Sequence, residues 1–260
     1  MSVSALVGHT GFVGGNLAAQ HAFDETFNSK NLEQIVGRSY DLLVVSAMPA
    51  AMWIANQDPT GDRSVLDRLL KSLLTVEAER VVVMSTIAVY PRPVGVDEET
   101  PIDSAAQTPY GRHRLALEQA LAERFANVTS IRLPALFGNG LKKNALYDLL
   151  HNHETHKINA ESRYQFYDLG RLWHDVSTAL AAGLKLVNFA TAPLTVREVA
   201  REVFGISFDN DNGAAPASFD VRSRHAASFG GTGGYLVDRA DVLAGLRKFV
   251  ATEQAAGSKS

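Results

Sequence analysis

The feature that most constrains the fold is a glycine-rich turn close to the amino terminus. Val3–Val7 predicts a short buried strand, the turn reads Gly8-His9-Thr10-Gly11-Phe12-Val13-Gly14, and Phe12–His21 predicts a helix. Glycines at this spacing let the chain turn tightly, let backbone approach a diphosphate, and let the helix pack closely on the strand. The amino end of a helix also attracts phosphate. The segment predicts a dinucleotide-binding β-turn-α unit, with a tight turn that binds nothing as the alternative.

Strands and helices alternate through the first half of the chain. Continuous apolar runs predict buried strands at Leu42–Val45, Arg80–Met84 and Val128–Leu133. Leucines at helical spacing from Leu66 to Leu74 predict one helix, and Tyr110–Phe125 predicts another. Strands that are apolar throughout are typical of parallel sheets covered on both faces. The predicted fold class is therefore α/β, a doubly wound parallel sheet of Rossmann type with a small carboxyl-terminal substrate lobe.

The alternation becomes less regular beyond Pro134, as expected where a substrate-binding lobe is interleaved with the last sheet elements. Here we predict a helix over Leu169–Leu180, a strand over Leu186–Ala190 and a helix start at the capping box Thr195-Val196-Arg197-Glu198, followed by a loop over Asn210–Ser218. The predicted organisation is a nucleotide-binding domain over 1–134 and about 164–192, a substrate lobe over 135–163 and 193–254, and a tail over Ala255–Ser260.

Composition excludes several classes of function. The 260-residue chain has no cysteine, so disulfides, thiolate nucleophiles and cysteine-based metal sites are excluded. A net charge of −3 with interspersed signs does not suit a nucleic-acid partner. No apolar run reaches membrane-spanning length and no secretory leader is recognisable, so we expect a cytoplasmic protein without membrane contact. His151, His153 and His156 lack the spacing of a zinc helix, and no metal is predicted.

The residues after the predicted second strand indicate which dinucleotide fits. An acidic residue about twenty positions after the first glycine would hold the ribose hydroxyls of NAD, whereas a cation there suits the 2′-phosphate of NADP. Asn28 is neutral, and Ser29 and Lys30 can donate to a phosphate, so the segment favours NADP. NAD remains the alternative if the strand ends a few residues earlier, where Asp24 and Glu25 stand.

Three residues form a candidate catalytic group. Ser85 and Thr86 follow a buried strand, at the carboxyl edge where open α/β sheets bind ligands. Tyr110 and Arg114 are four residues apart at the start of a helix and share a face. A cation beside a phenol favours the phenolate, so we expect Arg114 to lower the pKa of Tyr110 and make it a general acid–base group. Thr86 would hydrogen-bond the reacting oxygen of the substrate.

The motifs together resemble those of the extended short-chain dehydrogenase/reductases, in the NAD-dependent epimerase/dehydratase family. They match in order over roughly residues 3 to 140: the glycine loop, Ser85–Tyr90 as S-[ST]-x-x-V-Y, the acidic loop Glu99-Thr100-Pro101, Tyr110-Gly111 as the start of Y-G-x-x-K, and Arg132–Gly138 as R-x-x-N-V-Y-G.

The resemblance implies hydride transfer at a carbonyl or alcohol carbon of a small or nucleotide-sugar-like substrate. It assigns proton transfer to Tyr110 and Thr86, and it gives the residue at Arg114 the tasks of binding the nicotinamide ribose and lowering the tyrosine pKa. Two positions depart from the family pattern. Arg114 replaces a lysine, and Ala135 replaces an asparagine that often touches nucleotide-sugar substrates. Alternatives are an epimerase or dehydratase, a non-catalytic NAD(P)-binding sensor or scaffold, and an interaction protein that binds no nucleotide.

The expected partners are an NADP or NAD cofactor, a small substrate and, by resemblance, a second copy of the chain. Lys142 and Lys143 would suit an anionic substrate, although surface lysines beside a loop need no function. Arg163, Arg222 and Arg224 fall where the family's substrate lobe supplies phosphate-binding cations, and none is singled out. The expected cofactor-binding residues are Gly8, Thr10, Gly11, Phe12, Val13, Gly14, Asn28, Ser29, Lys30, Ser46, Ala47 and Pro134.

Overall fold

A computed structural model describes residues 3–257 of the chain, and these divide into two compact units. The first unit comprises residues 3–92, 99–133 and 172–188. The second comprises residues 93–98, 134–171 and 189–257. Each unit is described by itself below.

The first unit is built on a parallel sheet. Among the described residues six strands form it, in the order β2-β1-β3-β4-β6-β10, and every pairing between neighbours is parallel. The strands are β1 (Ser4–Val7), β2 (Glu25–Phe27), β3 (Ser39–Val45), β4 (Glu77–Thr86), β6 (Val128–Leu133) and β10 (Leu186–Asn188). All four residues of β1 and all six of β6 are buried, as expected for strands covered on both faces.

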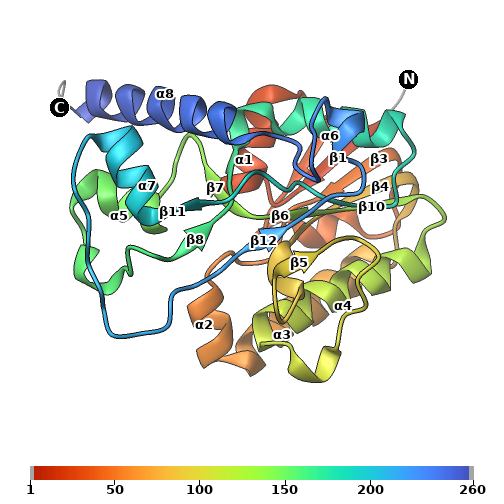
Figure 1. Cartoon of the computed structure of the whole chain (residues 1–260). Helices are drawn as coiled ribbons and strands as arrows, with labels where there is room; N and C mark the ends of the chain where they lie inside the picture. The colour runs from red at the N-terminus through yellow and green to blue at the C-terminus, as the bar shows by residue number, and fades with distance from the viewer. Residues whose placement is uncertain (1–2, 258–260) are drawn as a thin grey trace. The chain divides into compact units, whose positions relative to one another are not determined.

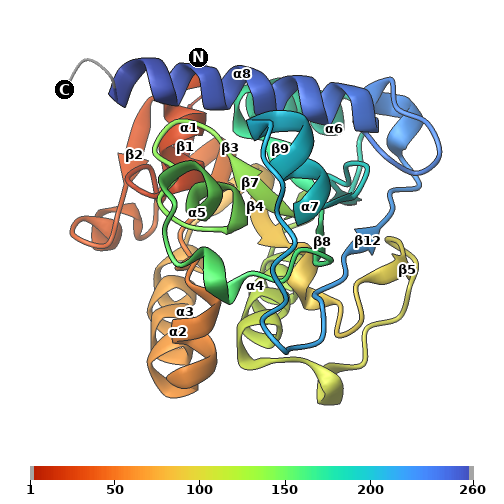
Figure 2. The same ribbon diagram turned by 60° about the vertical axis from the view of Figure 1, so that its left-hand side comes forward.

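Helices cover both faces of this sheet. Figure 1 shows α1 (Phe12–Gln20) and α6 (Leu172–Ala181) on one face, and α3 (Pro59–Leu73) and α4 (Pro109–Arg124) on the other. The short helix α2 (Met52–Gln57) lies beside α3 (Figure 2). Leucines of α3 at helical spacing are buried in the core under the sheet. The predicted doubly wound parallel sheet is confirmed.

The order of the strands indicates where the sheet binds ligands. In the sheet β1 lies between β2 and β3, so the order reverses between β1 and β3, and ligands bind at the carboxyl ends of strands on either side of such a reversal. The connection from β2 to β3 contains only a single 3₁₀ turn, Leu32–Ile35, in place of a crossover helix. Other 3₁₀ turns lie at Ile87–Val89, Ser104–Ala106, Thr155–Lys157, Leu169–Arg171 and Ala226–Phe229.

The second unit contains three small two-stranded sheets. These pair β5 (Val94–Val96) with β12 (Asp220–Val221), β7 (Ala135–Phe137) with β9 (Phe166–Asp168), and β8 (Arg163–Tyr164) with β11 (Leu194–Thr195). Its helices are α5 (Ala145–His151), α7 (Val196–Val199), which continues as a π-helical segment over Ala200–Phe204, and α8 (Arg239–Gly257). The capping box predicted at Thr195 and Glu198 is present at the start of α7.

Several elements differ from their predicted bounds. Residues 164–171, expected with the nucleotide-binding domain, fall in the second unit because β8 and β9 pair with β11 and β7. The helix expected from Leu169 begins at Leu172, after a 3₁₀ turn. The tail expected over Ala255–Ser260 is helical as far as Gly257, and the rest of it lies outside the described residues.

Trp173 of α6 is only half-buried. Its indole stacks on the His21 imidazole with ring centroids 3.9 Å apart, and Phe23 packs edge-on against it. His21 and Trp173 line a cavity of about 510 Å³ together with Ser4, Asp24 and other residues. This cavity lies at the amino edge of the sheet, opposite the edge where ligands are expected.

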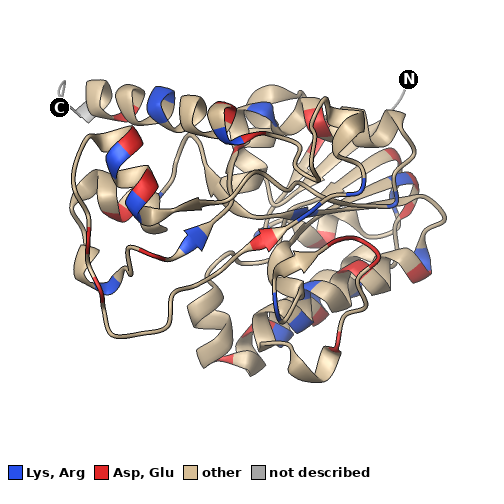
Figure 3. Ribbon diagram, viewed as in Figure 1, with Lys and Arg blue, Asp and Glu red and all other residues tan. Residues whose placement is uncertain are grey.

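Charge is spread along the helices rather than collected on one of them. Figure 3 shows both basic and acidic residues on α3 and α4. Within residues 3–257, no helix combines the length and apolarity needed to span a membrane.

Candidate active site

The glycine loop follows β1 at the carboxyl edge of the sheet. Gly8 has a φ of +96°, and a side chain there would lie 2.2 Å from the Ser46 carbonyl oxygen, at the end of β3. A Cβ on Gly14 would lie 2.1 Å from the Gly8 carbonyl oxygen. Only glycine therefore allows this close packing of the loop, α1 and β3.

The same loop leaves the start of α1 open to an anion. Gly11 is the N-cap and has no side chain that could accept from the first helical N–H groups. Phe12 and Val13 supply N–H groups of that first turn, and the exposed Thr10 precedes them. Uncapped N–H groups at a helix amino end, next to a tight glycine loop, fit a diphosphate. The residues present thus fit the dinucleotide that the sequence predicts.

The turn after β2 lies directly beside the glycine loop. Both the Gly8 N–H (2.7 Å) and His9 Nδ1 (3.0 Å) donate to the carbonyl oxygen of Phe27, the last residue of β2. Asn28 caps the following turn, since its Oδ1 accepts from the Lys30 N–H at 2.8 Å. Ser29 and Lys30 are exposed. Asn28, Ser29 and Lys30, which are predicted to distinguish NADP from NAD, therefore follow the end of β2, as expected.

The acidic residues that would favour NAD, Asp24 and Glu25, lie at the start of β2 and not at its end. Glu25 opposes Ala5 in the strand register and pairs with Arg38. Asp24 accepts from the N–H and the hydroxyl of Ser4, the first residue of β1. Neither carboxylate stands at the strand end beside the glycine loop.

Thr86 and Tyr110 meet beyond the end of β4. Thr86 is the last residue of the strand, and its hydroxyl lies close enough to the Tyr110 phenol to lower the pKa of that phenol. The Thr86 hydroxyl also accepts from the Ala88 N–H at 3.1 Å, which caps the following 3₁₀ turn. Two hydroxyls that can pass a proton to one substrate oxygen thus lie at the carboxyl edge of the sheet.

The amino end of α4 is built to hold Tyr110 in that place. Thr108 caps the helix and Pro109 occupies its first position. The Tyr110 N–H donates to Asn56 Oδ1 of α2 at 3.0 Å. A Cβ on Gly111 would lie 2.3 Å from the Ala88 carbonyl oxygen, so glycine at this position lets α4 approach the segment that follows Thr86.

Arg114 is buried against the face of the Tyr110 ring. Its Cζ lies 3.9 Å from the ring centroid, and the residue is 3% exposed. Nη1 donates to Asp62 Oδ2 at 2.5 Å and to the Tyr110 carbonyl oxygen at 3.3 Å, and Nη2 donates to the Pro49 carbonyl oxygen at 2.5 Å. Arg114 therefore ties α4 to α3 and to the segment after β3.

Burial dominates the acidity of the phenol. It raises the pKa of Tyr110 by more than Arg114 and Thr86 lower it, and Asp62 raises it further. Arg114 lowers the pKa of Tyr110 as expected, but not by enough to bring it below the ordinary value of a phenol. A buried phenol has lost the hydration that would stabilise its charged form.

A buried polar network lies behind Thr86. The Ser85 hydroxyl donates to Glu118 Oε1, and Glu118 in turn accepts from Arg132 of β6, with Nη2 and Oε2 2.7 Å apart. Arg132 Nη1 also donates to the Tyr90 hydroxyl at 2.8 Å. Arg132 and Glu118 are 4% and 5% exposed. The network joins the ends of β4 and β6 to α4, so it supports the segment that carries Thr86.

Other predicted residues belong to the second unit. Pro134 and Ala135 open its main segment, and Lys142 and Lys143 are exposed. Two of the arginines expected there lie near carboxylates: Arg222 is 3.6 Å from Asp220, and Arg224 is 3.9 Å from Asp97. In residues 3–257 no group of three or more histidine or acidic side chains is arranged to hold a metal ion.

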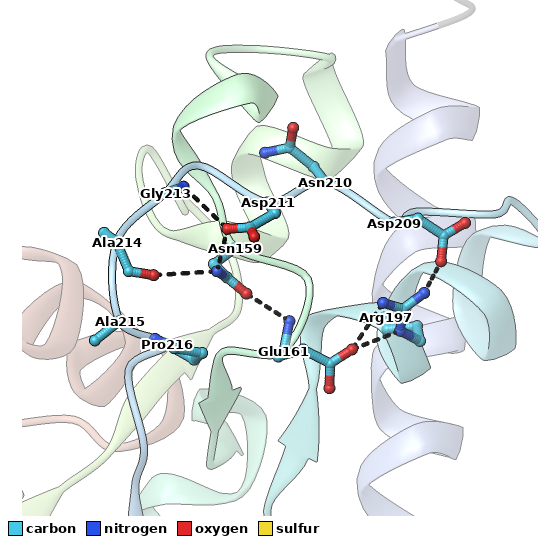
Figure 4. A pocket seen from close by; sticks show the side chains of 10 residues that line it. All are labelled: Asn159, Glu161, Arg197, Asp209, Asn210, Asp211, Gly213, Ala214, Ala215 and Pro216. Atoms are coloured by element: carbon cyan, nitrogen blue, oxygen red, sulfur yellow. Dashed lines mark hydrogen bonds and ion pairs between the residues drawn. The ribbon is translucent and has the colours of Figure 1, made fainter.

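The second unit also has a polar cavity of about 430 Å³, between the loop 209–216 and the segment that precedes β8 (Figure 4). Arg197 is its only described basic side chain, and it is paired with Glu161 at 2.7 Å and with Asp209. Asn159 Nδ2 donates to Asp211 Oδ1 at 3.1 Å. None of the predicted site residues lines this cavity.

Sequence reasoning missed the partners that hold the site together. Asp62 was overlooked although it precedes Leu66 by four residues and Leu69 by seven, which places a carboxylate on the buried stripe of α3. Glu118 stands in the same way on the buried face of α4. In both cases the sequence signal was a charged residue that recurs at helical spacing with buried leucines.

Comparisons with known proteins agree with this architecture. The family model described as NAD dependent epimerase/dehydratase family matches residues 25–163, which is more than half of the chain and begins after the glycine loop. No curated protein sequence matches the chain.

Solved structures share the fold at low sequence identity. The dTDP-4-dehydrorhamnose reductase of Bacillus anthracis in complex with NADP has a TM-score of 0.76 at 15% identity, covering 96% of this chain and 98% of that one. MoeE5 in complex with UDP-glucuronic acid and NAD has a TM-score of 0.73 at 19% identity, with 98% and 99% covered. TunA, an NAD-dependent NDP-hexosamine 5,6-dehydratase, has a TM-score of 0.70 at 17% identity, with 98% of both chains covered. With its Rossmann-like parallel sheet and the matched family model, the chain belongs to the NAD-dependent epimerase/dehydratase family.

Proposed function

We propose that the protein is an NAD(P)-dependent oxidoreductase that transfers hydride at a carbonyl or alcohol carbon of a small substrate. The single observation that carries this proposal is that Thr86 and Tyr110 lie close together at the sheet edge that also carries the glycine loop. A proton donor and a nicotinamide must meet at one carbon–oxygen bond for this reaction, and that edge offers a place for both.

The cofactor is held by the first unit. The N–H groups at the start of α1 bind the diphosphate, and Gly8 and Gly14 keep the loop tight enough for its approach. Ser46 and Ala47, after β3, form the other wall of the loop. Ser29 and Lys30 bind a 2′-phosphate, which makes NADP the preferred dinucleotide. When bound, the cofactor supplies or accepts the hydride.

Tyr110 moves the proton. Its hydroxyl donates to the substrate oxygen as hydride reaches the carbon, and Thr86 holds that oxygen in place. Arg114 stacks on the ring and fixes its orientation, while the support of Asn56 and Gly111 places the start of α4. A ribose contact by Arg114 stays a prediction, because the described contacts direct its donors to Asp62, Pro49 and its own helix.

The substrate class is proposed from the structural relatives. The reductase, MoeE5 and TunA named above act on or bind nucleotide sugars by their names, and a nucleotide sugar or a related anionic compound is the substrate we propose here. Epimerisation and dehydration use the same hydride and proton transfers and remain alternatives. A homodimer is also proposed, on the family resemblance alone.

The mechanism is tested by replacing Tyr110 with phenylalanine. We expect Tyr110→Phe to lose about 10²- to 10⁴-fold in the oxidation of NADPH by 4-keto nucleotide sugars, followed by nicotinamide absorbance. Binding of NADPH, measured by fluorescence titration, should be unchanged and serves as the control for folding. Turnover at the wild-type rate in this variant would rule out the assigned role.

A second candidate function rests on Arg114. An arginine cannot pass a proton on as a lysine can, and this one is held by buried partners, which suits a protein that binds NAD(P) without turning it over. This alternative predicts NADPH binding by the wild-type protein with no oxidation across the same panel of sugars. Measurable turnover by the wild-type protein decides against it.

A further inference from the structure

Asp62 is a buried carboxylate that the mechanism above does not use. It lies in the first turn of α3, on the face that carries Leu66 and Leu69, and it is 7% exposed. Two donors of α4 converge on its Oδ2 atom: His113 Nδ1 at 2.7 Å and Arg114 Nη1 at 2.5 Å. A buried carboxylate needs such partners, because burial of an unpaired charge is strongly unfavourable.

The position of Asp62 determines where the arginine lies. Arg114 is anchored at one nitrogen by Asp62 and at the other by the Pro49 carbonyl oxygen. With both ends held, the guanidinium plane is fixed over the Tyr110 ring, 3.9 Å from its centroid. Because both terminal nitrogens are anchored, the side chain is limited to one orientation.

Asp62 also balances the charge beside the phenol. The charged groups that act on Tyr110 are Arg114 on its own helix and Asp62 on α3, while its neighbours from β4 and α2 are the uncharged Thr86 and Asn56. Arg114 lowers the pKa of Tyr110 and Asp62 raises it. Opposite charges in contact largely cancel at a third group, whereas an unpaired arginine in a poorly hydrated site would act on the phenol at full strength.

We propose that Asp62 is a positioning residue of this site, which fixes Arg114 against Tyr110 and offsets its charge, so that the guanidinium does not oppose the burial that keeps Tyr110 a neutral phenol. The consequence is that Tyr110 starts as a proton donor. It would give its proton to the oxygen of a substrate carbonyl whose carbon receives hydride from bound reduced NAD(P). The products are an alcohol, oxidised NAD(P) and a tyrosinate that regains its proton from water. The site is therefore set for carbonyl reduction, and this consequence rests on the proposed function.

The charge balance is tested without any substrate, by titrating the tyrosines through their ultraviolet absorbance as the pH is raised. In Asp62→Asn, which keeps the shape and removes the charge, we expect one tyrosine to titrate at least about one pH unit below its wild-type value. The shifted titration should vanish in Asp62→Asn combined with Tyr110→Phe, which assigns it. Asp67→Asn is the matched control, since Asp67 is an exposed carboxylate of the same helix paired with Arg63, and it should change nothing.

A second variant separates charge from packing and covers the case in which Asp62→Asn does not fold. Asp62→Asn combined with Arg114→Gln replaces the ion pair with two amides, and the titration of Tyr110 should return close to its wild-type value. Titration in Asp62→Asn that matches the wild type would overturn the proposal. The proposal would also be overturned if Tyr110 in the double variant titrated below its wild-type value, as it is expected to do in Asp62→Asn alone.

The outcome does not depend on the proposed function. A shifted titration in a protein that reduces no carbonyl compound would support the role of Asp62 and contradict the oxidoreductase proposal. Carbonyl reduction by a protein whose Tyr110 titration is insensitive to Asp62 would do the opposite.

Discussion

Removing the Glu118 carboxylate should destabilise the protein strongly, because it leaves a buried arginine without a counter-ion. Glu118 accepts from Arg132 through Nε at 3.1 and 3.2 Å and through Nη2 at 2.7 Å, and it also accepts from the Ser85 hydroxyl. Breaking a buried pair by removing one partner costs about 3–5 kcal/mol. Since whole domains are stable by only about 5–15 kcal/mol, Glu118→Leu should lose a large part of the total.

The expected change is measurable in urea. With an m-value near 3 kcal/mol per molar, a loss of about 3–5 kcal/mol lowers the urea midpoint by about 1–2 M. Glu123→Ala is the control on the same helix, because Glu123 is exposed and its removal should cost under about 0.5 kcal/mol. Circular dichroism and intrinsic fluorescence should report the same midpoint for each variant.

A double variant distinguishes the unpaired charge from general loss of packing. Glu118→Leu with Arg132→Met removes both charges, and the Tyr90 hydroxyl keeps Asn188 as a partner. We expect the double variant to be more stable than Glu118→Leu alone, by about 2 kcal/mol, because no buried charge is left unpaired. A double variant as unstable as the sum of the two single variants would refute this reasoning.

Two further variants test the cofactor loop. Gly14→Ala places a methyl group 2.1 Å from the Gly8 carbonyl oxygen and should weaken NADPH binding at least about tenfold, whereas at Gly15 the nearest atom is 3.6 Å from the added methyl group and Gly15→Ala should bind normally. Equal binding by both variants in a fluorescence titration would contradict the packing argument. Lys30→Ala should raise the Kd for NADPH about tenfold and leave the Kd for NADH nearly unchanged, since only NADPH carries the 2′-phosphate. An equal loss for both dinucleotides would mean that Lys30 does not select between them.

Apolar runs predicted the buried strands well because those strands are covered on both faces. β6 has the bounds expected from sequence, Val128–Leu133, and all its residues are buried. β4 extends beyond its predicted core to Glu77 at one end and to Thr86 at the other. Its first residues are exposed or half-buried and, apart from Ala78, charged, so they carry no continuous apolar signal even though they pair in the sheet.

Hydrophobic periodicity could not predict the order of the strands in the sheet. β1 pairs with both β2 and β3, and the choice depends on contacts between segments distant in the sequence. The second unit was harder still, because its described strands have two or three residues. Segments so short show no repeat of either period, and they pair only because the chain around them holds them in register.

The tyrosine site shows a further limit of motif reasoning. The motif gives a cation four residues after Tyr110, and from that spacing alone the cation should make the phenol acidic. The structure adds a carboxylate from α3, and the net charge next to the phenol is then close to zero. Asp62 lies far from Tyr110 in sequence, and no spacing rule joins them. It could have been found only by asking why a carboxylate stands on a leucine stripe, because such a residue must pair with a buried cation and so changes what that cation does elsewhere. An arginine in the place of a lysine is therefore best judged together with the acid that accompanies it.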